Sequence, residues 1–239
     1  MNFLDGYYPQ DYEIVVIMDG CTDKTVDVIS KFVGNGRRIV SLVYSKKLEK
    51  GGALIEAFKR SQGEVLFFTD ADGSLPPKEL PKFVKAIEMN DLVMGCRYYK
   101  GSIFMDNLPL KRFMFSRIFN TLVKLLFPKL NGIRDTQCGA KAVRKDSLWA
   151  IGDDLFISDF AFDVNLIYSA LRHGFSVSEV CADYNHVESS SKVSYRILKT
   201  GSAMFLSLVR LRLVDSRFGR VLYDRHLNGL IGFLMKVAQ

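Results

Sequence analysis

Short apolar runs alternate with amphipathic segments through the first part of the chain. Four runs rich in β-branched or other apolar residues predict buried strands, at residues 12–18, 38–44, 64–69 and 91–97. The segments between them carry apolar residues at helical spacing and predict helices, at residues 25–33, 51–63 and 76–88. Strands that alternate with helices in this way are typical of an α/β fold, with a mostly parallel sheet and helices on both faces.

The second half of the chain follows a different pattern. Residues 108–127 are far more apolar than a surface helix, and their charges are almost all basic. Such a segment is either a buried core helix or an amphipathic helix in the headgroup region of a membrane. Further strands and helices are predicted at residues 141–144, 161–174, 176–184 and about 195–213. We expect one domain over residues 1–213, followed by an amphipathic tail at 214–239.

Composition narrows the class of protein. The 239 residues are 48% apolar, enough for the core of one large domain. Four cysteines without C-x-x-C spacing argue against a zinc site and a disulfide framework, and favour reduced thiols in the cytosol. No apolar run approaches the roughly 20 residues that span a bilayer, and the N-terminal residues lack the features of a signal peptide. The net charge of +7 fits an anionic partner: nucleic acid, lipid headgroups or a phosphorylated substrate.

Acidic residues follow two of the predicted strands. Asp19 ends the first strand, and Asp70 and Asp72 end the third. Ligands of open parallel sheets bind outside the carboxyl ends of the strands, so these carboxylates are expected at one edge. Two neighbouring carboxylates repel each other unless a cation lies between them, and Mg²⁺ or Mn²⁺ with oxygen ligands suits that position. The alternative for each residue is a turn or a helix cap.

The stretch "LFFTDADGSL" is also close to the hhhhDxDG[ST] pattern of haloacid-dehalogenase-like phosphatases, in which the first aspartate is a nucleophile. In those enzymes the motif follows the first strand of the fold. Here two strand–helix units precede it, and no convincing lysine with an acidic pair lies downstream. This interpretation is therefore a remote alternative.

A longer series of segments resembles the nucleotide-sugar glycosyltransferases of family two, which have the Rossmann-like GT-A fold. The first segments of this series are "EIVVIMDGCTDKT", "KGGALIEAF", "GEVLFFTDADGSLPPKEL" and "GCRY". The later segments "RFMFSRIFN", "GIRDTQCGAKAVRKD", "FAFDVNLIY" and "SSKV" resemble dolichyl-phosphate β-glucosyltransferase and related polyprenyl-phosphate glycosyltransferases. The resemblance covers about residues 12–213, and "IRDTQCG" favours the glucosyl branch.

The resemblance implies a donor site. Asp70 and Asp72 would form the DxD motif that holds Mg²⁺ or Mn²⁺ and, through it, the diphosphate of the sugar nucleotide. A divalent ion there stabilises the charge of the departing nucleoside diphosphate as a Lewis acid. The other positions that correspond to nucleotide contacts are Asp19, Lys50, Gly51, Gly52 and, in a loop that closes over the nucleotide, Lys192.

The resemblance also implies a lipid-phosphate acceptor. A phosphate monoester is anionic at neutral pH, so it can attack the anomeric carbon without a general base, and arginines suit its binding. The acceptor-phosphate positions correspond to Arg97, Arg112 and Ser116. Asp135 and Gln137 correspond to the sugar pocket, and Asp135 is counted with Asp70 and Asp72 among the catalytic residues.

These features predict an inverting hexosyltransferase, peripheral on the cytoplasmic face of a membrane, with residues 108–127 at the interface. It would move glucose from UDP-glucose to dolichyl or polyprenyl phosphate, and nucleic acid is not an expected partner. GDP-mannose as donor, or another family-two transfer, stays an alternative. Relatives begin with a "VVIPAYNE"-like strand that this chain lacks and that would lie in the middle of the sheet. An inactive truncated homologue is therefore a further alternative.

Overall fold

The computed structural model describes residues 2–8, 12–34, 38–99, 110–185 and 193–216. Its strands are β1 (Ile14–Asp19), β2 (Ile39–Tyr44), β3 (Val65–Phe68), β4 (Leu92–Cys96), β5 (Lys141–Arg144) and β6 (Val177–Cys181). Its helices are α1 (Asn2–Tyr7), α2 (Thr25–Ser30), α3 (Glu49–Arg60), α4 (Leu80–Ile87), α6 (Leu110–Leu126), α7 (Lys145–Ala150), α8 (Phe162–Arg172) and α9 (Val193–Asp215). Three short 3₁₀ helices are η1 (Pro77–Glu79), η2 (Pro128–Leu130) and η3 (Gly152–Asp154). Almost all of the expected tail lies outside the described residues.

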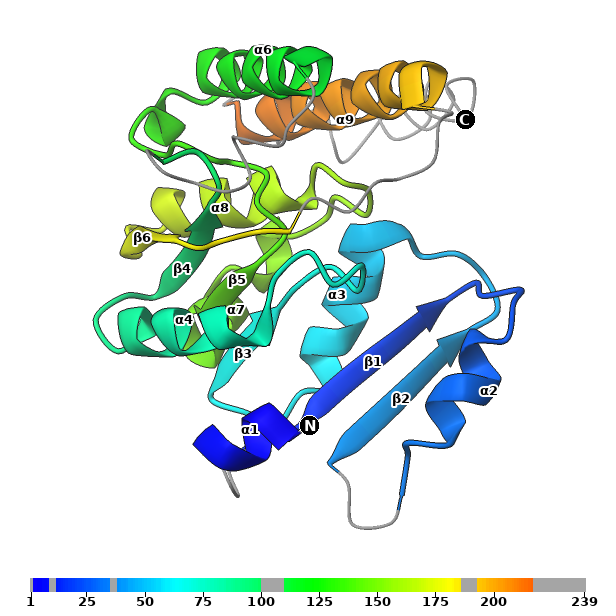
Figure 1. The fold of residues 1–239 in the computed structure, drawn as a ribbon. Helices are drawn as coiled ribbons and strands as arrows, with labels where there is room; N and C mark the ends of the chain where they lie inside the picture. The colour runs from blue at the N-terminus through cyan, green and yellow to red at the C-terminus, as the bar shows by residue number, and fades with distance from the viewer. Residues whose placement is uncertain (1, 9–11, 35–37, 100–109, 186–192, 217–239) are drawn as a thin grey trace.

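The strands form two sheets rather than the single sheet expected from the sequence (Figure 1). β1 and β2 form a parallel pair, and the other four strands have the order β3-β5-β4-β6. β4 and β6 are parallel, but β5 runs antiparallel to both of its neighbours. The strand pairing is therefore mixed: the parallel pairing expected from the sequence is present in β1–β2 and β4–β6, and β5 adds two antiparallel pairs.

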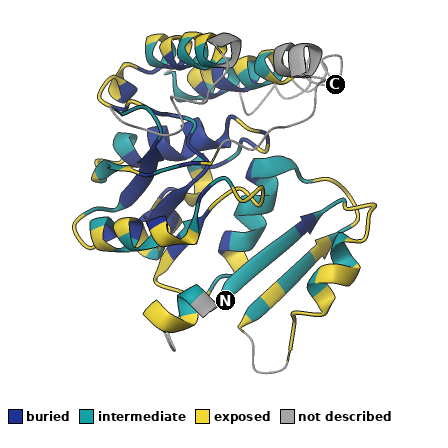
Figure 2. Ribbon diagram, viewed as in Figure 1, coloured by how far each residue is buried: buried dark blue, intermediate teal, exposed yellow. Residues whose placement is uncertain are grey.

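Burial differs between the two sheets (Figure 2). Every residue of β4 is buried, and so are the first nine residues of α8, from Phe162 to Ala170. The residues of β1 are only partly buried, apart from Met18. One core cluster packs β3, β4 and β5 against α8, and a second lies under α4 around Phe83. The four-stranded sheet therefore forms the rigid part of the molecule that positions the candidate site.

Helix α6 corresponds to the basic apolar segment and packs beside α9 (Figure 1). Its inner face is buried at Asn120 and Val123. Its outer face exposes apolar side chains at helical spacing, which we call the α6 stripe: Met114, Phe115, Ile118, Leu122 and Leu125. The helix is thus amphipathic and not a core helix buried on all sides. None of the helices in the described part of the chain is long and apolar enough to cross a bilayer.

Candidate active site

The DxD segment follows β3 at the edge expected from the sequence. Asp70 and Asp72 both lie in an exposed turn. The Asp72 carboxylate accepts a hydrogen bond of 2.9 Å from the backbone N–H of Ser74. Gly73, which lies between Asp72 and Ser74, has a φ of +72° that glycine adopts without strain. One Asp70 oxygen lies 3.1 Å from the ammonium group of Lys50. The turn therefore presents both carboxylates to solvent, and one of them is already paired with a cation.

Lys50 belongs to a buried charge cluster that also contains Asp163 and Lys141. The two Asp163 oxygens lie 2.8 Å from Lys50 Nζ and 2.6 Å from Lys141 Nζ, and Lys141 also donates to the carbonyl of Cys138 at 2.5 Å. Burial opposes the charged form of Lys50, but Asp163 and Asp70 outweigh it and raise the pKa of Lys50. Burial likewise opposes ionisation of Asp163, but the two lysines lower its pKa. Lys50 and Asp163 are therefore both charged at neutral pH.

Two glycines allow close approaches around this cluster. A Cβ atom on Gly139 would lie 2.0 Å from Asp70 Oδ2, so the Asp70 carboxylate packs directly on the Gly139 backbone. The Gly51 N–H donates to Ser158 O at 2.5 Å, and a Cβ there would lie 2.3 Å from Ile157 O. In this structure Gly51 thus brings α3 against residues 157–158. Its expected place near the nucleotide stays a prediction.

Asp19 has a structural role at the end of β1. Its carboxylate accepts hydrogen bonds from the backbone N–H groups of Leu48 at 2.5 Å and Glu49 at 3.0 Å. Backbone N–H groups at the start of a helix have no carbonyl partner within the helix. The Asp19 carboxylate accepts the bonds of two such groups at the start of α3. Asp19 therefore joins β1 to α3, as the helix-cap alternative expected. The nucleobase contact implied by the resemblance stays a prediction.

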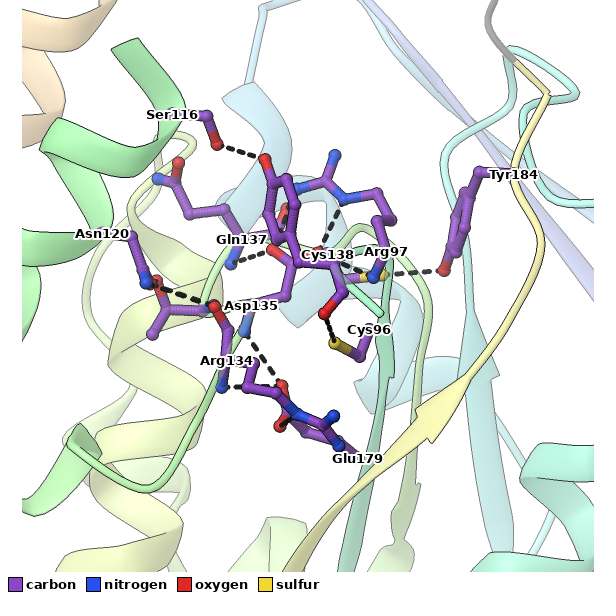
Figure 3. A network of polar contacts seen from close by, with 12 residues as sticks. Cys96, Arg97, Ser116, Asn120, Arg134, Asp135, Gln137, Cys138, Glu179 and Tyr184 are labelled. Atoms are coloured by element: carbon purple, nitrogen blue, oxygen red, sulfur yellow. Dashed lines mark hydrogen bonds and ion pairs between the residues drawn. The ribbon is translucent and has the colours of Figure 1, made fainter. Parts of the chain in front are cut away.

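Arg97 and Asp135, which the sequence assigned to different parts of the site, form an ion pair (Figure 3). Arg97 Nε and Nη2 donate to the two Asp135 oxygens at 2.7 and 2.9 Å, and the Arg97 backbone N–H adds a bond of 3.2 Å. Burial disfavours the charged guanidinium, but Asp135 outweighs it and raises the pKa of Arg97. The bidentate contact fixes the plane of the guanidinium. Because Asp135 is saturated by these donors, it suits a positioning role better than that of a proton acceptor.

The remaining predicted acceptor residues surround this pair. The backbone carbonyl of Gln137 accepts a bond of 3.3 Å from Arg97 Nη2, while the Gln137 side-chain Nε2 is buried with no hydrogen-bond partner among the described residues. Buried amide groups are rarely left unpaired, so Nε2 fits a hydrogen bond to a bound substrate. Ser116 on α6 shares a hydrogen bond of 2.5 Å with the hydroxyl of Tyr98. Arg112 lies on α6, but its side chain is not described, and Lys192 lies outside the described residues.

One segment joins the two charged groups of the site. Residues 135–141 begin at Asp135, reach Gly139 against Asp70, and end at Lys141 beside Asp163. Gln137 is two residues from Gly139, and two residues of extended chain span at most about 7 Å. The Cα atoms of Gln137 and Gly139 are thus separated by no more than about the length of one hexose, and Gly139 is the residue that contacts Asp70. Along the chain, Gln137 therefore lies between Asp135, which binds Arg97, and Gly139, which contacts Asp70.

Three residues that hold this arrangement together were not predicted from the sequence. Asp163 and Lys141 orient Lys50, and the Glu179 carboxylate on β6 accepts the backbone N–H groups of Arg134 and Asp135, both at 2.9 Å. A signal was present for the first two. A lysine inside "GAKAV" and an aspartate inside "FAFDV" are charges in apolar stretches, which indicates a buried pair. Glu179 lies on a half-exposed strand and offered no such signal.

The donor atoms around the DxD turn fit a hard divalent ion. Asp70 and Asp72 provide carboxylate oxygens, which Mg²⁺ and Mn²⁺ prefer. Within the described residues no group of three or more acidic, histidine or cysteine side chains could hold a metal by itself. Mg²⁺ is typically bound through one or two carboxylates and completed by water and substrate phosphates. The residues present therefore fit a metal that is shared with a diphosphate.

Comparisons with known proteins identify the family of this chain. The family model described as glycosyl transferase family 2 matches residues 2–152, which include the DxD turn. Glycosyltransferase AglD of Haloferax volcanii is 30% identical over 76% of this chain and 29% of its own length. The dolichyl-phosphate β-glucosyltransferase of Homo sapiens is 30% identical over 77% of this chain and 59% of its own length. The chain spans less than two thirds of the length of the first curated relatives that it matches.

Among solved structures, glucosyl-3-phosphoglycerate synthase from Mycobacterium tuberculosis, in complex with Mn²⁺, UDP and glucosyl-3-phosphoglycerate, resembles this chain with a TM-score of 0.61. The match covers 86% of this chain and 70% of that chain at 19% identity, so it shows the GT-A-like fold alone. The family match excludes the phosphatase alternative for Asp70. With its mixed α/β fold and its DxD turn after β3, the chain belongs to glycosyl transferase family 2.

Proposed function

We propose that this chain transfers a hexose from a sugar nucleotide to a polyprenyl phosphate at a membrane surface. The observation that carries the proposal is the segment 135–141, which joins the DxD turn to the Arg97–Asp135 pair. A sugar donor with a diphosphate and an acceptor with a phosphate are both anionic. One end of the segment offers carboxylates for a shared metal, and the other offers a guanidinium. Both substrates can thus approach the sugar at Gln137 from opposite sides.

The proposed chemistry is a single displacement. Bound Mg²⁺ or Mn²⁺ would supply Lewis-acid stabilisation of the departing diphosphate. Arg97, held in plane by Asp135, would attract the acceptor phosphate with the positive charge of its guanidinium. The phosphate oxygen is already anionic, so it attacks the anomeric carbon without a base, and the bond to the nucleoside diphosphate breaks on the opposite side. Attack from opposite the leaving group inverts the configuration at that carbon.

Lys50 has a defined part in this scheme. Its ammonium group lies between Asp163 and Asp70 and neutralises part of the charge of the DxD turn. Like charges would otherwise destabilise the paired carboxylates. Lys50 therefore orients the Asp70 carboxylate, and it adds a positive charge at the place where a diphosphate would bind.

The donor is proposed to be UDP-glucose. The names of several relatives support glucose, since they are dolichyl-phosphate β-glucosyltransferases from Homo sapiens, Mus musculus and Saccharomyces cerevisiae. The solved neighbour was crystallised with UDP. GDP-mannose is the competing donor, and a direct comparison of the two decides between them.

The α6 stripe supports contact with a membrane. A face with exposed Phe115, Ile118 and Leu125, flanked by the basic residues Arg117 and Lys124, matches an amphipathic helix at an interface. We place the enzyme at the cytoplasmic face because its cysteines, Cys21, Cys96, Cys138 and Cys181, all carry free thiols, which persist in a reducing compartment.

The test is a transfer assay with purified protein, Mn²⁺ or Mg²⁺, dolichyl phosphate in vesicles, and radiolabelled UDP-glucose or GDP-mannose. We expect label from UDP-glucose in the lipid-soluble fraction. Asp72→Ala should abolish metal-dependent UDP binding in calorimetry, whereas Asp153→Ala, an exposed acid in η3, should leave it unchanged. Absence of lipid-soluble label with both donors would refute the proposed activity, and label from GDP-mannose alone would correct the donor.

A further inference from the structure

Helix α6 contacts the loop that carries Asp135 through one buried polar side chain (Figure 3). Asn120 lies on the inner face of α6 and is 4% exposed. Its Nδ2 donates to Arg134 O at 3.2 Å, and its Oδ1 accepts the Thr136 hydroxyl at 2.8 Å and the Thr136 N–H at 3.5 Å. Both ends of the Asn120 amide are thus bonded to residues on either side of Asp135.

The opposite side of the same loop is held by β6. Glu179 accepts the backbone N–H groups of Arg134 and Asp135. The backbone of residues 134–136 therefore has polar partners on α6 and on β6. Held between them, Asp135 directs its carboxylate at Arg97.

The bonds to the loop account for an asparagine at this position. The inner face of α6 is otherwise apolar around Val123, and a buried amide costs free energy unless all of its groups are bonded. The helix makes two further contacts of the same kind, since Arg117 Nη1 also donates to Arg134 O and Ser116 bonds Tyr98, the neighbour of Arg97. One helix therefore contacts both chain segments that form the Arg97–Asp135 pair.

We propose that Asn120 is a positioning residue: it fixes the loop of residues 134–136, and through Asp135 it sets the orientation of Arg97. The part that concerns the acceptor phosphate rests on the proposed function, whereas the positioning of the loop does not. Because the same helix presents the α6 stripe on its outer face, Asn120 also links the membrane-facing surface to the acceptor end of the site.

Hydrogen exchange in the free protein tests the positioning directly. Asn120→Ala should speed exchange of the backbone amides of residues 134–137 by at least about tenfold, because the loop loses its bonds to α6. Thr136→Val, an isosteric change at the partner, should give part of this effect and should add little in the Asn120→Ala background. Thr121→Ala is the matched control, since Thr121 is the exposed neighbour on the same helix and bonds only within it. Unchanged exchange in both Asn120→Ala and Thr136→Val would overturn the proposal.

Kinetics test the consequence for the acceptor. With a water-soluble isoprenoid monophosphate as acceptor, Asn120→Ala should raise the acceptor KM by about tenfold or more and leave the donor KM within about twofold. Equal changes in both KM values, or a loss that only follows the thermal stability, would indicate a merely structural role and overturn the proposal. If Asn120→Ala does not fold, Thr136→Val is measured in its place. If the wild type transfers no sugar, the proposed function fails, and hydrogen exchange alone decides the positioning of the loop.

Discussion

The two charged groups at the ends of segment 135–141 are built differently. At one end, Lys50 and Lys141 meet a single carboxylate, Asp163, which is almost fully buried. At the other end, Arg97 meets Asp135 in a planar bidentate pair. In the first group, each lysine makes single nitrogen–oxygen contacts with a carboxylate, and the group ends at the exposed Asp70. In the second group, the bidentate contact fixes the plane of the Arg97 guanidinium. We therefore expect the lysine cluster to determine the stability of the fold and the charge on the proposed donor side. We expect the arginine pair to determine the geometry of the proposed acceptor side.

The largest expected effect is on the lysine cluster. Asp163→Asn removes the carboxylate partner of the buried Lys141 and leaves it neutral acceptors, Cys138 O and the new side-chain amide. Breaking a buried ion pair from one side typically costs about 3–5 kcal/mol, so we expect the free energy of unfolding in urea to fall by about that amount. The double variant Asp163→Asn with Lys141→Met removes both charges and should recover most of the loss. A single variant as stable as the wild type would contradict the role of Asp163.

The arginine pair should respond in catalysis. Arg97→Lys keeps the charge but loses the bidentate contact with Asp135. A hydrogen bond between charged groups contributes about 1.5–3 kcal/mol, so kcat/KM for the lipid phosphate should fall by about ten- to a hundredfold. Arg134→Lys, at an exposed pair with Glu179, should stay within about twofold. If Arg97→Lys raised the donor KM instead, the division between the two ends would be wrong.

A smaller effect is expected at the α6 stripe. Leu125→Ser removes the most exposed side chain of the α6 stripe, which is 73% exposed. Burying a leucine contributes roughly 1.5–3 kcal/mol, and partial insertion a fraction of that, so binding to anionic vesicles in a sedimentation assay should weaken by about tenfold. Met89→Ser, an exposed apolar residue after α4, should not change vesicle binding. Equal loss in both variants would indicate a non-specific effect of exposed apolar area.

Acid perturbs the lysine cluster without any substitution. The pKa of Asp163 is lower in the folded protein than in the unfolded chain, so its ion pairs stabilise the fold above about pH 4, the ordinary range of an aspartate. That contribution is lost as the pH falls through the folded-state pKa. The urea midpoint of the wild type should therefore fall more steeply on acidification than that of the Asp163→Asn, Lys141→Met double variant. Parallel curves would remove Asp163 from the acid response.

The sequence predicted where the strands lie in the chain, but not which strands and helices pack against them or in which direction they pair. The runs around Val16 and Val93 are both continuous and apolar, yet β1 is half-exposed and β4 is fully buried. Apolar content indicates that a strand forms, whereas its burial depends on which strands and helices pack on it. The direction of β5 was likewise missed, because the pattern of "KAVR" is the same for parallel and antiparallel pairing.

For the site, the motifs proposed candidate residues and the structure supplied their partners. Asp70, Asp72, Arg97 and Asp135 were all proposed from the sequence, but nothing in it pairs Arg97 with a residue 38 positions away. Such long-range contacts depend on the register of β4 and the loop before β5. Asn120 and Glu179 were missed for the same reason, since each contributes only through the loop that it holds.

Gly139 gives the DxD turn a steric limit that does not depend on charge. Any side chain at this position would occupy the space of the Asp70 carboxylate, since even a Cβ atom would lie 2.0 Å from its oxygen. A single added methyl group should thus move Asp70 without altering the formal charge of the protein. Under the proposed function, Gly139→Ala, the smallest substitution that adds a side chain, would therefore weaken sugar transfer by displacing the Asp70 carboxylate.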